Sequence, residues 1–365
     1  MPLSAVDAIN PAFQHTAQQL LKPFRAAQWA KLALVGFLAG EMSSSGCSVP
    51  NLHGGFGDRG SHRFAEPGLP NFSVPHPPHL DPIALAALVA FLILAGVAFG
   101  VLLIYVNSMM RFVLFDSVIA KECRIREAWR RRHNEGLRYF VWQILLLLTS
   151  MAGMVILIGI PAGFALVLGW LKQPHQHMVG LILGGIVLFF LFMGFALTVL
   201  IVTVLTKDFV VPQMALEHIS AIEGWRRLLT MMKSEKVGYA GYIGMKIVLA
   251  LGAAVVVGIV AAIVALVLLI PVGGFGLIAV LAGKTAGLTW NLYTITLAIV
   301  AGCMILAILL YVISLVSVPA MVFFPAYSIY FFAARYRQLG AIVYPLPAIP
   351  LQVGPSFPAS PEPAG

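Results

Sequence analysis

The sequence has few charged residues, and two long stretches have no acidic residue. Asp, Glu, Lys and Arg make up 10% of its 365 residues, against roughly a quarter in soluble domains. Residues 139–206 and 237–360 contain neither Asp nor Glu. This composition excludes an ordinary soluble protein. It also argues against a proton-driven pump, because pumps place acidic groups within the membrane.

Cysteines and nucleotide-binding motifs are also scarce. Cys47, Cys123 and Cys303 have no paired spacing, so no disulfide framework is implied. The glycine-rich segments at residues 54–57 and 273–276 lack the Lys-Ser/Thr of a P-loop and are better explained as turns. We expect no cofactor.

The histidines are the remaining candidates for metal ligands. His76 with His79 and His175 with His177 could each offer two imidazoles. No Cys or carboxylate cluster accompanies either pair, and a zinc site normally needs three or four protein ligands. We therefore expect solvated loop histidines and no metal site.

Long apolar runs are what the sequence has in abundance. Hydrophobic residues make up 60% of the chain. A helix needs roughly 20 apolar residues to cross about 30 Å of hydrocarbon. Five runs meet this requirement, at residues 83–106, 139–171, 179–206, 237–270 and 288–318. The sequence predicts an all-α, polytopic membrane bundle of about six transmembrane helices.

The sixth predicted span covers residues 26–42 and is short. Trp29 and Lys31 form a plausible aromatic and basic anchor pair at its start. A re-entrant or interfacial helix is a second interpretation. A cleaved signal peptide is a third, although the apolar stretch begins late and no small-x-small site follows it cleanly. The distribution of charge favours a retained span.

The basic residues predict the orientation. The net charge is +9, but these residues sit in short segments that adjoin the spans, which favours topology over nucleic-acid binding. Residues 111–138 and 207–236 are the richest segments and should be cytoplasmic. With six spans, Lys22, Arg25, Arg335 and Arg337 lie on the same side. We expect a multi-pass protein of the inner (plasma) membrane with both termini cytoplasmic.

The chain divides into five predicted regions. Residues 1–25 should form a cytoplasmic amphipathic segment on the membrane surface, followed by the short span at 26–42. Residues 43–81 are rich in Gly, Pro and His and should form an external loop. Residues 82–336 should form a five-span bundle with amphipathic cytoplasmic connectors. Residues 337–365 should be a flexible, Pro-rich cytoplasmic tail.

The two cytoplasmic connectors share an E-x-W-R-R motif, which suggests a duplicated helical hairpin. In the second copy, Ser220 and Glu223 have capping-box spacing. Ile222, Trp225, Leu229 and Met232 follow at helical intervals, so we expect an interfacial helix with Trp225 buried. The alternative is two unrelated connectors that anchor at a membrane surface. In either case the predicted interface anchors are Trp129, Arg130, Arg131, Trp225, Arg226 and Arg227.

Two residues within the apolar runs are candidates for a permeation pathway. Lys246 is the one basic residue well inside a long run, where it could extend to the cytoplasmic interface or bind a substrate or ion. Pro161 should kink or end its span, because proline lacks a backbone donor and clashes with the preceding turn.

These motifs support one distant resemblance. The segment at residues 20–25, LLKPFR, stands before Trp29, and the E-x-W-R-R connectors precede later spans. In this pattern the chain resembles uncharacterised bacterial polytopic membrane proteins that look distantly like the membrane domain of glycerophosphoryl diester phosphodiesterases. Those enzymes hydrolyse their substrates with a separate soluble domain, so the resemblance implies an envelope membrane protein and no catalytic residue.

Three functions follow as hypotheses. The first is a non-enzymatic scaffold or accessory component in bacterial envelope or lipid homeostasis. It would contact membrane lipids, including anionic headgroups, and membrane-protein partners. The second is a transporter or channel for a lipid or small molecule. The third, a membrane-embedded enzyme, is the weakest, because no nucleophile and base pair can be named.

Overall fold

The computed structural model describes residues 4–22, 24–41, 82–170, 174–285 and 292–344. Within these ranges the chain is helical and has no strand, which confirms the all-α prediction. The predicted external loop at 43–81 lies outside the described residues, as does the tail from residue 345. The first part of the predicted tail forms helix α11 (Arg337–Val343).

Five helices are long and apolar enough to cross a membrane, and they confirm the five apolar runs. They are α3 (Pro82–Ala120), α5 (His133–Val167), α6 (Met178–Leu205), α9 (Lys236–Thr285) and α10 (Leu292–Ala333). The helix α6 continues through a π-helical turn, η2 (Thr206–Val210), into α7 (Val211–Glu217). The helical path of this span therefore extends past the apolar run at 179–206 to Glu217. The chain is a multi-pass membrane protein.

The sixth predicted span is a shorter helix than expected. It is α2 (Ala26–Leu38), whose 13 residues give a length of about 20 Å, less than the hydrocarbon thickness of about 30 Å. It packs between α3 and α10. The indole N–H of Trp29 donates to the Leu315 carbonyl at 2.9 Å, and the Asn107 amide donates to the Leu38 carbonyl at 3.0 Å. A full crossing by residues 26–42 stays a prediction.

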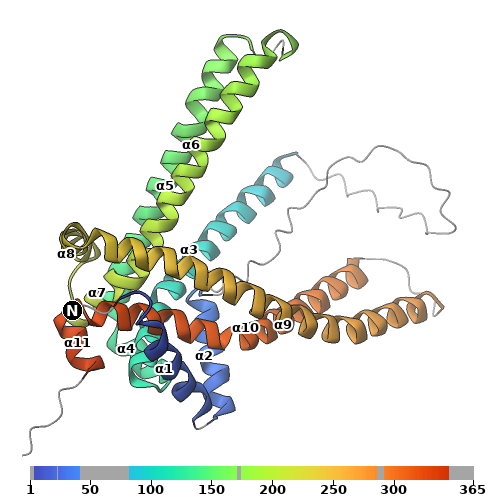
Figure 1. Cartoon of the computed structure of the whole chain (residues 1–365). Coiled ribbons are helices and arrows are strands. Elements are labelled where there is room, and N and C mark those ends of the chain that lie inside the picture. The colour runs from blue at the N-terminus through green and yellow to red at the C-terminus, as the bar shows by residue number, and fades with distance from the viewer. Residues whose placement is uncertain (1–3, 23, 42–81, 171–173, 286–291, 345–365) are drawn as a thin grey trace, which may run out of the picture.

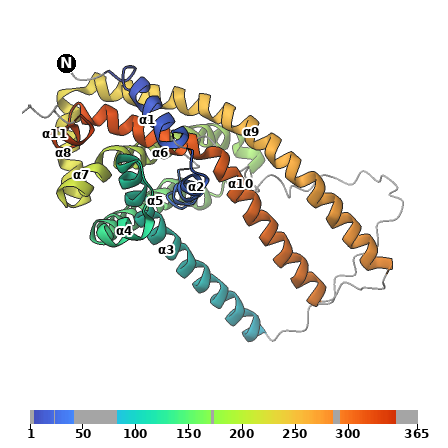
Figure 2. The ribbon, with the colours of Figure 1, turned by 90° about the horizontal axis from the view of Figure 1, so that it is seen from below.

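Each of the long helices has a packed end and an exposed end. Their packed ends meet α1 (Ile9–Leu21), α2, α4 (Ile125–Arg131), η2, α7, α8 (Ala221–Ser234) and α11 in one compact unit, which we call the base. Its largest buried side chains include Phe112, Tyr139, Phe209, Tyr242 and Phe331. The other ends, which we call the arms, separate from one another: the α5–α6 hairpin, the outer part of α3, and the outer parts of α9 and α10 (Figures 1 and 2).

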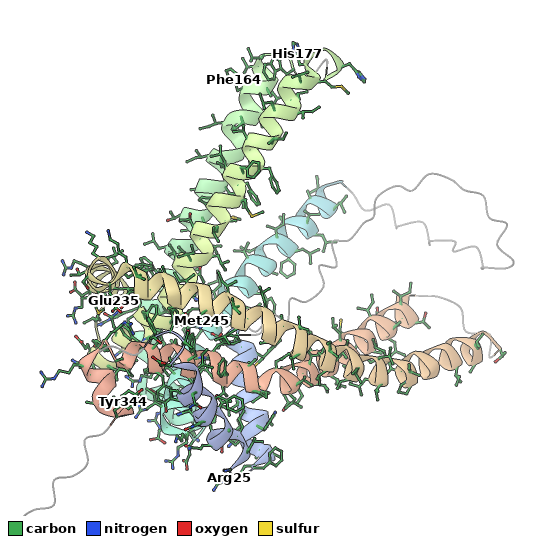
Figure 3. The ribbon with its side chains drawn as sticks, in the orientation of Figure 1. Arg25, Phe164, His177, Glu235, Met245 and Tyr344 are labelled. Carbon is green, nitrogen blue, oxygen red and sulfur yellow. The ribbon has the colours of Figure 1, made fainter. Side chains whose placement is uncertain are left out.

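The arms carry their apolar side chains on the outside. Examples are Phe91 on α3, Phe190 on α6 and Val256 on α9, each more than 60% exposed. Figure 3 shows Phe164 and His177 at the far tip of the α5–α6 hairpin, with Glu235 and Tyr344 in the base. Such surfaces are stable in hydrocarbon and unfavourable in water. The arms are thus the parts that suit the bilayer core.

Helix α1 turns several polar residues toward the base and leaves some of its apolar residues exposed. Its polar residues His15, Thr16 and Gln19 face the base, while Phe13 and Leu21 are 66% and 59% exposed. His15 accepts from the Tyr330 hydroxyl at 3.2 Å and donates to the Val118 carbonyl at 2.8 Å. Exposed apolar residues on a short helix are typical of a helix at a membrane surface, and the surface position of residues 1–25 stays a prediction.

Candidate functional site

The base contains a group of charged side chains drawn from four segments of the chain. Glu41 follows α2, Arg111 belongs to α3, Lys207 and Asp208 belong to η2, and Lys246 belongs to α9. Together with Ser328 of α10 they line one small cavity. The lining therefore contains three cations and two carboxylates.

The first ion pair joins Arg111 to Glu41. Arg111 donates one Nη to the Glu41 carboxylate and the other to the Ala39 carbonyl, and both side chains are less than 10% exposed. The Arg111 Nε is also buried and has no hydrogen-bond partner among the described residues. A buried guanidinium needs acceptors for its donors, so one donor of this arginine is left unsatisfied at the cavity.

The second ion pair joins Lys246 to Asp208. The Asp208 Oδ2 accepts from the Lys246 ammonium and, at 2.9 Å, from the Tyr242 hydroxyl. The Lys246 Nζ also lies 5.9 Å from the centre of the Tyr242 ring, within the range of a cation–π contact. Tyr242 in turn stacks on Tyr327 at a centroid distance of 5.2 Å. The pair is therefore held in place by aromatic packing on two sides.

The π-helical turn brings Lys207 and Asp208 to the same cavity. The Val211 N–H bonds to the Thr206 carbonyl, five residues back, in place of the usual four. Pro212 has no N–H to give the Asp208 carbonyl, so the regular ladder is interrupted at this position. A wide turn of this kind is rare and is found mostly at functional sites. Here it lets two consecutive charged residues line one cavity.

Lys207 differs from the other two cations. It is half-buried and makes no hydrogen bond or ion pair with a described residue. The cavity beside it has a volume of about 30 Å³, which exceeds the roughly 10–15 Å³ that one water molecule needs. The site can therefore hold a small polar group next to an uncompensated positive charge.

A second hollow lies where the arms leave the base. It is a cleft of about 440 Å³ between α3, α5 and α6, lined by Leu103, Ile104, Asn107, Gln143, Leu146, Leu147, Ser150, Val199 and Thr203. Its polar side is a hydrogen-bonded chain. Gln143 donates to Asn107 at 3.2 Å and accepts from the Ser108 hydroxyl at 2.5 Å. The rest of the cleft is apolar, so it suits an amphipathic molecule.

The first connector places its motif on α4. Trp129 packs edge-on against Tyr105 of α3 at 6.1 Å. Arg131 and its neighbour Arg132 both bind Asp116, at 2.7 and 3.1 Å, and the hydrogen bond that Arg131 donates to Asp116 raises the pKa of Arg131. Arg130 is exposed. One motif arginine is thus free to reach headgroups, and one is held by the protein.

The second connector places its motif on α8. The Ser220 hydroxyl caps the helix by accepting from the Glu223 N–H at 3.3 Å, as the capping box predicted. The Trp225 indole donates to Thr206 at 3.0 Å and packs on Trp142. Arg226 and Arg227 pair with Glu223, and the hydrogen bond from Arg227 lowers the pKa of that carboxyl.

The apolar stripe of α8 is divided between two faces, because Trp225 and Met232 pack against the core. Ala221, Gly224 and Leu228 face the protein, while Ile222 and Leu229 are 67% and 47% exposed. Ile222 and Leu229 are the part of the stripe that lies on the outside. At a membrane surface such a stripe can contact lipid, which is why it does not need a protein partner.

The two pathway candidates are far apart in the fold. Lys246 is in the base, where its side chain is only 12% exposed and paired with Asp208. Figure 3 labels its neighbour Met245 at the point where α9 leaves the base. Pro161 is exposed on the arm formed by α5, which continues past it to Val167. The structure does not bring the two together.

Sequence reasoning missed most of the charged group, namely Glu41, Arg111, Lys207 and Asp208. A signal was present. Lys207 and Asp208 stand between the apolar segments at 199–205 and 209–211 without a turn residue, and Arg111 is likewise flanked by apolar residues. Charges inside a continuing apolar helix are expensive and need a partner.

Comparisons with known proteins give one match. The model of DUF7544, described as a family of unknown function, matches residues 3–342. No curated protein and no solved structure matches the chain. No link to the membrane domain of glycerophosphoryl diester phosphodiesterases is shown, so that resemblance stays a prediction. In the described part of the chain, no group of three His, Cys, Asp or Glu residues could hold a metal ion.

Proposed function

The chain belongs to DUF7544, a family of unknown function, and on that premise we propose that it is a non-enzymatic membrane component. Its role would be that of a scaffold or accessory subunit in bacterial envelope or lipid homeostasis. The bacterial inner membrane, with cytoplasmic termini, is part of the same proposal.

The separation of the arms is the observation that carries this proposal. The outer halves of α3, α5, α6, α9 and α10 bury almost none of their apolar surface within the chain. The α5–α6 hairpin stands apart from α9 and α10 (Figure 1). Membrane helices associate through close packing of their faces. Faces left free in this way are available to lipids and to other membrane proteins.

The ion pairs formed by the charged groups of the base support a structural role for the base. Arg111, Lys246 and Arg335 are each paired with a carboxylate, so these groups hold helices together. A hydrolytic site would need a nucleophile in hydrogen-bond reach of a base that a third group orients. The paired carboxylates of the cavity instead accept from cations and a tyrosine.

Site-specific photocrosslinking in cells tests the scaffold role. A photoreactive residue at Phe190, exposed on the α6 arm, should capture the same protein partner in repeated experiments. The matched control is Phe112, which is fully buried in the base and should capture none. Adducts of lipid alone from Phe190, together with purification of the chain alone in mild detergent, would contradict the scaffold role.

A transporter or channel for a lipid or small molecule is the second candidate, and the cleft between α3, α5 and α6 is the observation that favours it. Its polar chain at Asn107 and Gln143 would meet a headgroup, and its apolar wall would meet an acyl chain. Reconstitution into vesicles with a fluorescent lipid tests this function. Transbilayer movement that the chain accelerates, and that Gln143→Leu slows, would support it. No acceleration over empty vesicles would exclude it.

A further inference from the structure

The cavity between α3, η2, α9 and α10 combines an excess of positive charge with unsatisfied donors. We propose that it binds a phosphate group, supplied by an anionic membrane lipid or by free phosphate. The binding groups are Lys207 and the Nε of Arg111, with Lys246 contributing charge.

Charge counting selects an anion over a cation. Of the three cations, Arg111 and Lys246 are paired with Glu41 and Asp208, which leaves the positive charge of Lys207 uncompensated. Both carboxylates already accept hydrogen bonds from a cation, and the three cations outnumber them, so the net charge of the lining favours an anion. An anionic oxygen would compensate Lys207 and also accept from the buried Arg111 Nε, which has no acceptor among the described residues.

The size of the cavity limits how much of a ligand enters. About 30 Å³ is room for one or two oxygen-sized groups and not for a whole lipid headgroup. A phosphate would therefore insert one or two oxygens, while the groups esterified to it stay outside. Lys207, which is half-buried, is one of the residues that line the cavity.

The position of the cavity along the helices favours a lipid as the source. The exposed apolar arms begin close by in sequence, at Leu103 on α3, Leu200 on α6 and Ile247 on α9. Three cations from three helical segments thus stand where hydrocarbon gives way to headgroups. Basic side chains at this level of the cytoplasmic leaflet attract anionic lipids. This step rests on the proposed function only in placing the base at the inner membrane surface.

Native mass spectrometry of the full chain in detergent tests the site, with phosphatidylglycerol and phosphatidylcholine as probes. Lys207→Gln removes the uncompensated charge without stranding a carboxylate. We expect this variant to bind phosphatidylglycerol about fivefold more weakly, the factor for loss of one basic contact, with phosphatidylcholine unchanged. Lys207→Arg should restore binding. The matched control is Lys233→Gln, an exposed lysine on α8, which should bind like the unchanged protein.

A second measurement identifies the source of the phosphate. If free phosphate is the ligand, inorganic phosphate should raise the melting temperature of the unchanged protein and not that of Lys207→Gln. If a lipid is the ligand, only phosphatidylglycerol should do so. Equal lipid binding and equal phosphate response in Lys207→Gln and Lys233→Gln would overturn the proposal. Loss of protein crosslinks from Phe190 would leave these results unaffected, so the two proposals fail independently.

Discussion

Lys246 on α9 and Asp208 in the π-helical turn form an ion pair inside the base, and each side chain is about one-tenth exposed. The pair joins two helices that the chain connects only through α7 and α8. Lys246 therefore has a counterion within the protein.

Breaking this pair on one side should destabilise the protein. Lys246→Met leaves the Asp208 carboxylate buried with Tyr242 as its remaining donor, and a buried charge without its counterion costs about 3 kcal/mol. Thermal unfolding in detergent measures the loss. Adding Asp208→Asn should recover about half of it, because the stranded charge is then removed. A double variant less stable than Lys246→Met would show that the pair itself contributes little.

Gly224 in the second E-x-W-R-R motif gives a prediction in which two effects oppose each other. Alanine favours a helix over glycine by about 1 kcal/mol. A Cβ at Gly224 would, however, lie 2.8 Å from Cγ1 of Val210, which is fully buried in the π-helical turn. A β-branched side chain cannot swing aside, and overpacking costs about 1–3 kcal/mol. Gly224→Ala should therefore lower the melting temperature.

The control for this prediction is Gly241 on α9, where a Cβ would meet nothing within 4 Å. Gly241→Ala should leave the melting temperature unchanged or raise it, since only the helix preference remains. If Gly224→Ala behaved in the same way, close packing of α8 on the turn would not be the reason for glycine there.

The buried side chain of His15 should make the thermal stability of the protein depend on pH. Burial lowers the pKa of His15 below its ordinary value of 6.5, so the folded protein binds this proton less readily than the unfolded chain. Its contribution to stability is complete above pH 6.5 and declines as pH falls toward the lowered pKa. Melting temperatures in detergent should therefore drop between pH 7.5 and 5.5.

The variant His15→Gln should reduce the slope of that decline. His133→Gln, at the exposed start of α5, is the matched control and should keep the slope. Equal slopes in His15→Gln and in the unchanged protein would assign the pH dependence to other groups.

The topology predicts which sites face which side of the membrane. The base holds α4 and α8, and the tip of the α5–α6 hairpin lies at the other end of a long apolar arm (Figure 3). Single cysteines placed at Glu122 and Lys233 in a cysteine-free chain should react with an impermeant maleimide only after the cells are opened. A cysteine at His175 should react in intact cells. Labelling of all three in intact cells would contradict the arrangement.

The sequence by itself determined the helical class, the five long spans, the cap at Ser220 and the amphipathic connectors. These features depend on the composition and periodicity of single segments, which the chain displays without reference to its fold. The apolar runs also indicated where each helix would be exposed to lipid.

Only the tertiary structure decided what the charged residues do. Glu41 and Arg111 are 70 positions apart in sequence, and their pairing depends on α2 packing against α3. The same holds for Lys246, whose partner Asp208 lies just beyond the apolar run that was expected to end at residue 206. A charge near a span can face solvent, lipid or a distant counterion with the same local sequence. The packing of the base selects the counterion, because a buried charge is stable only where another segment supplies one.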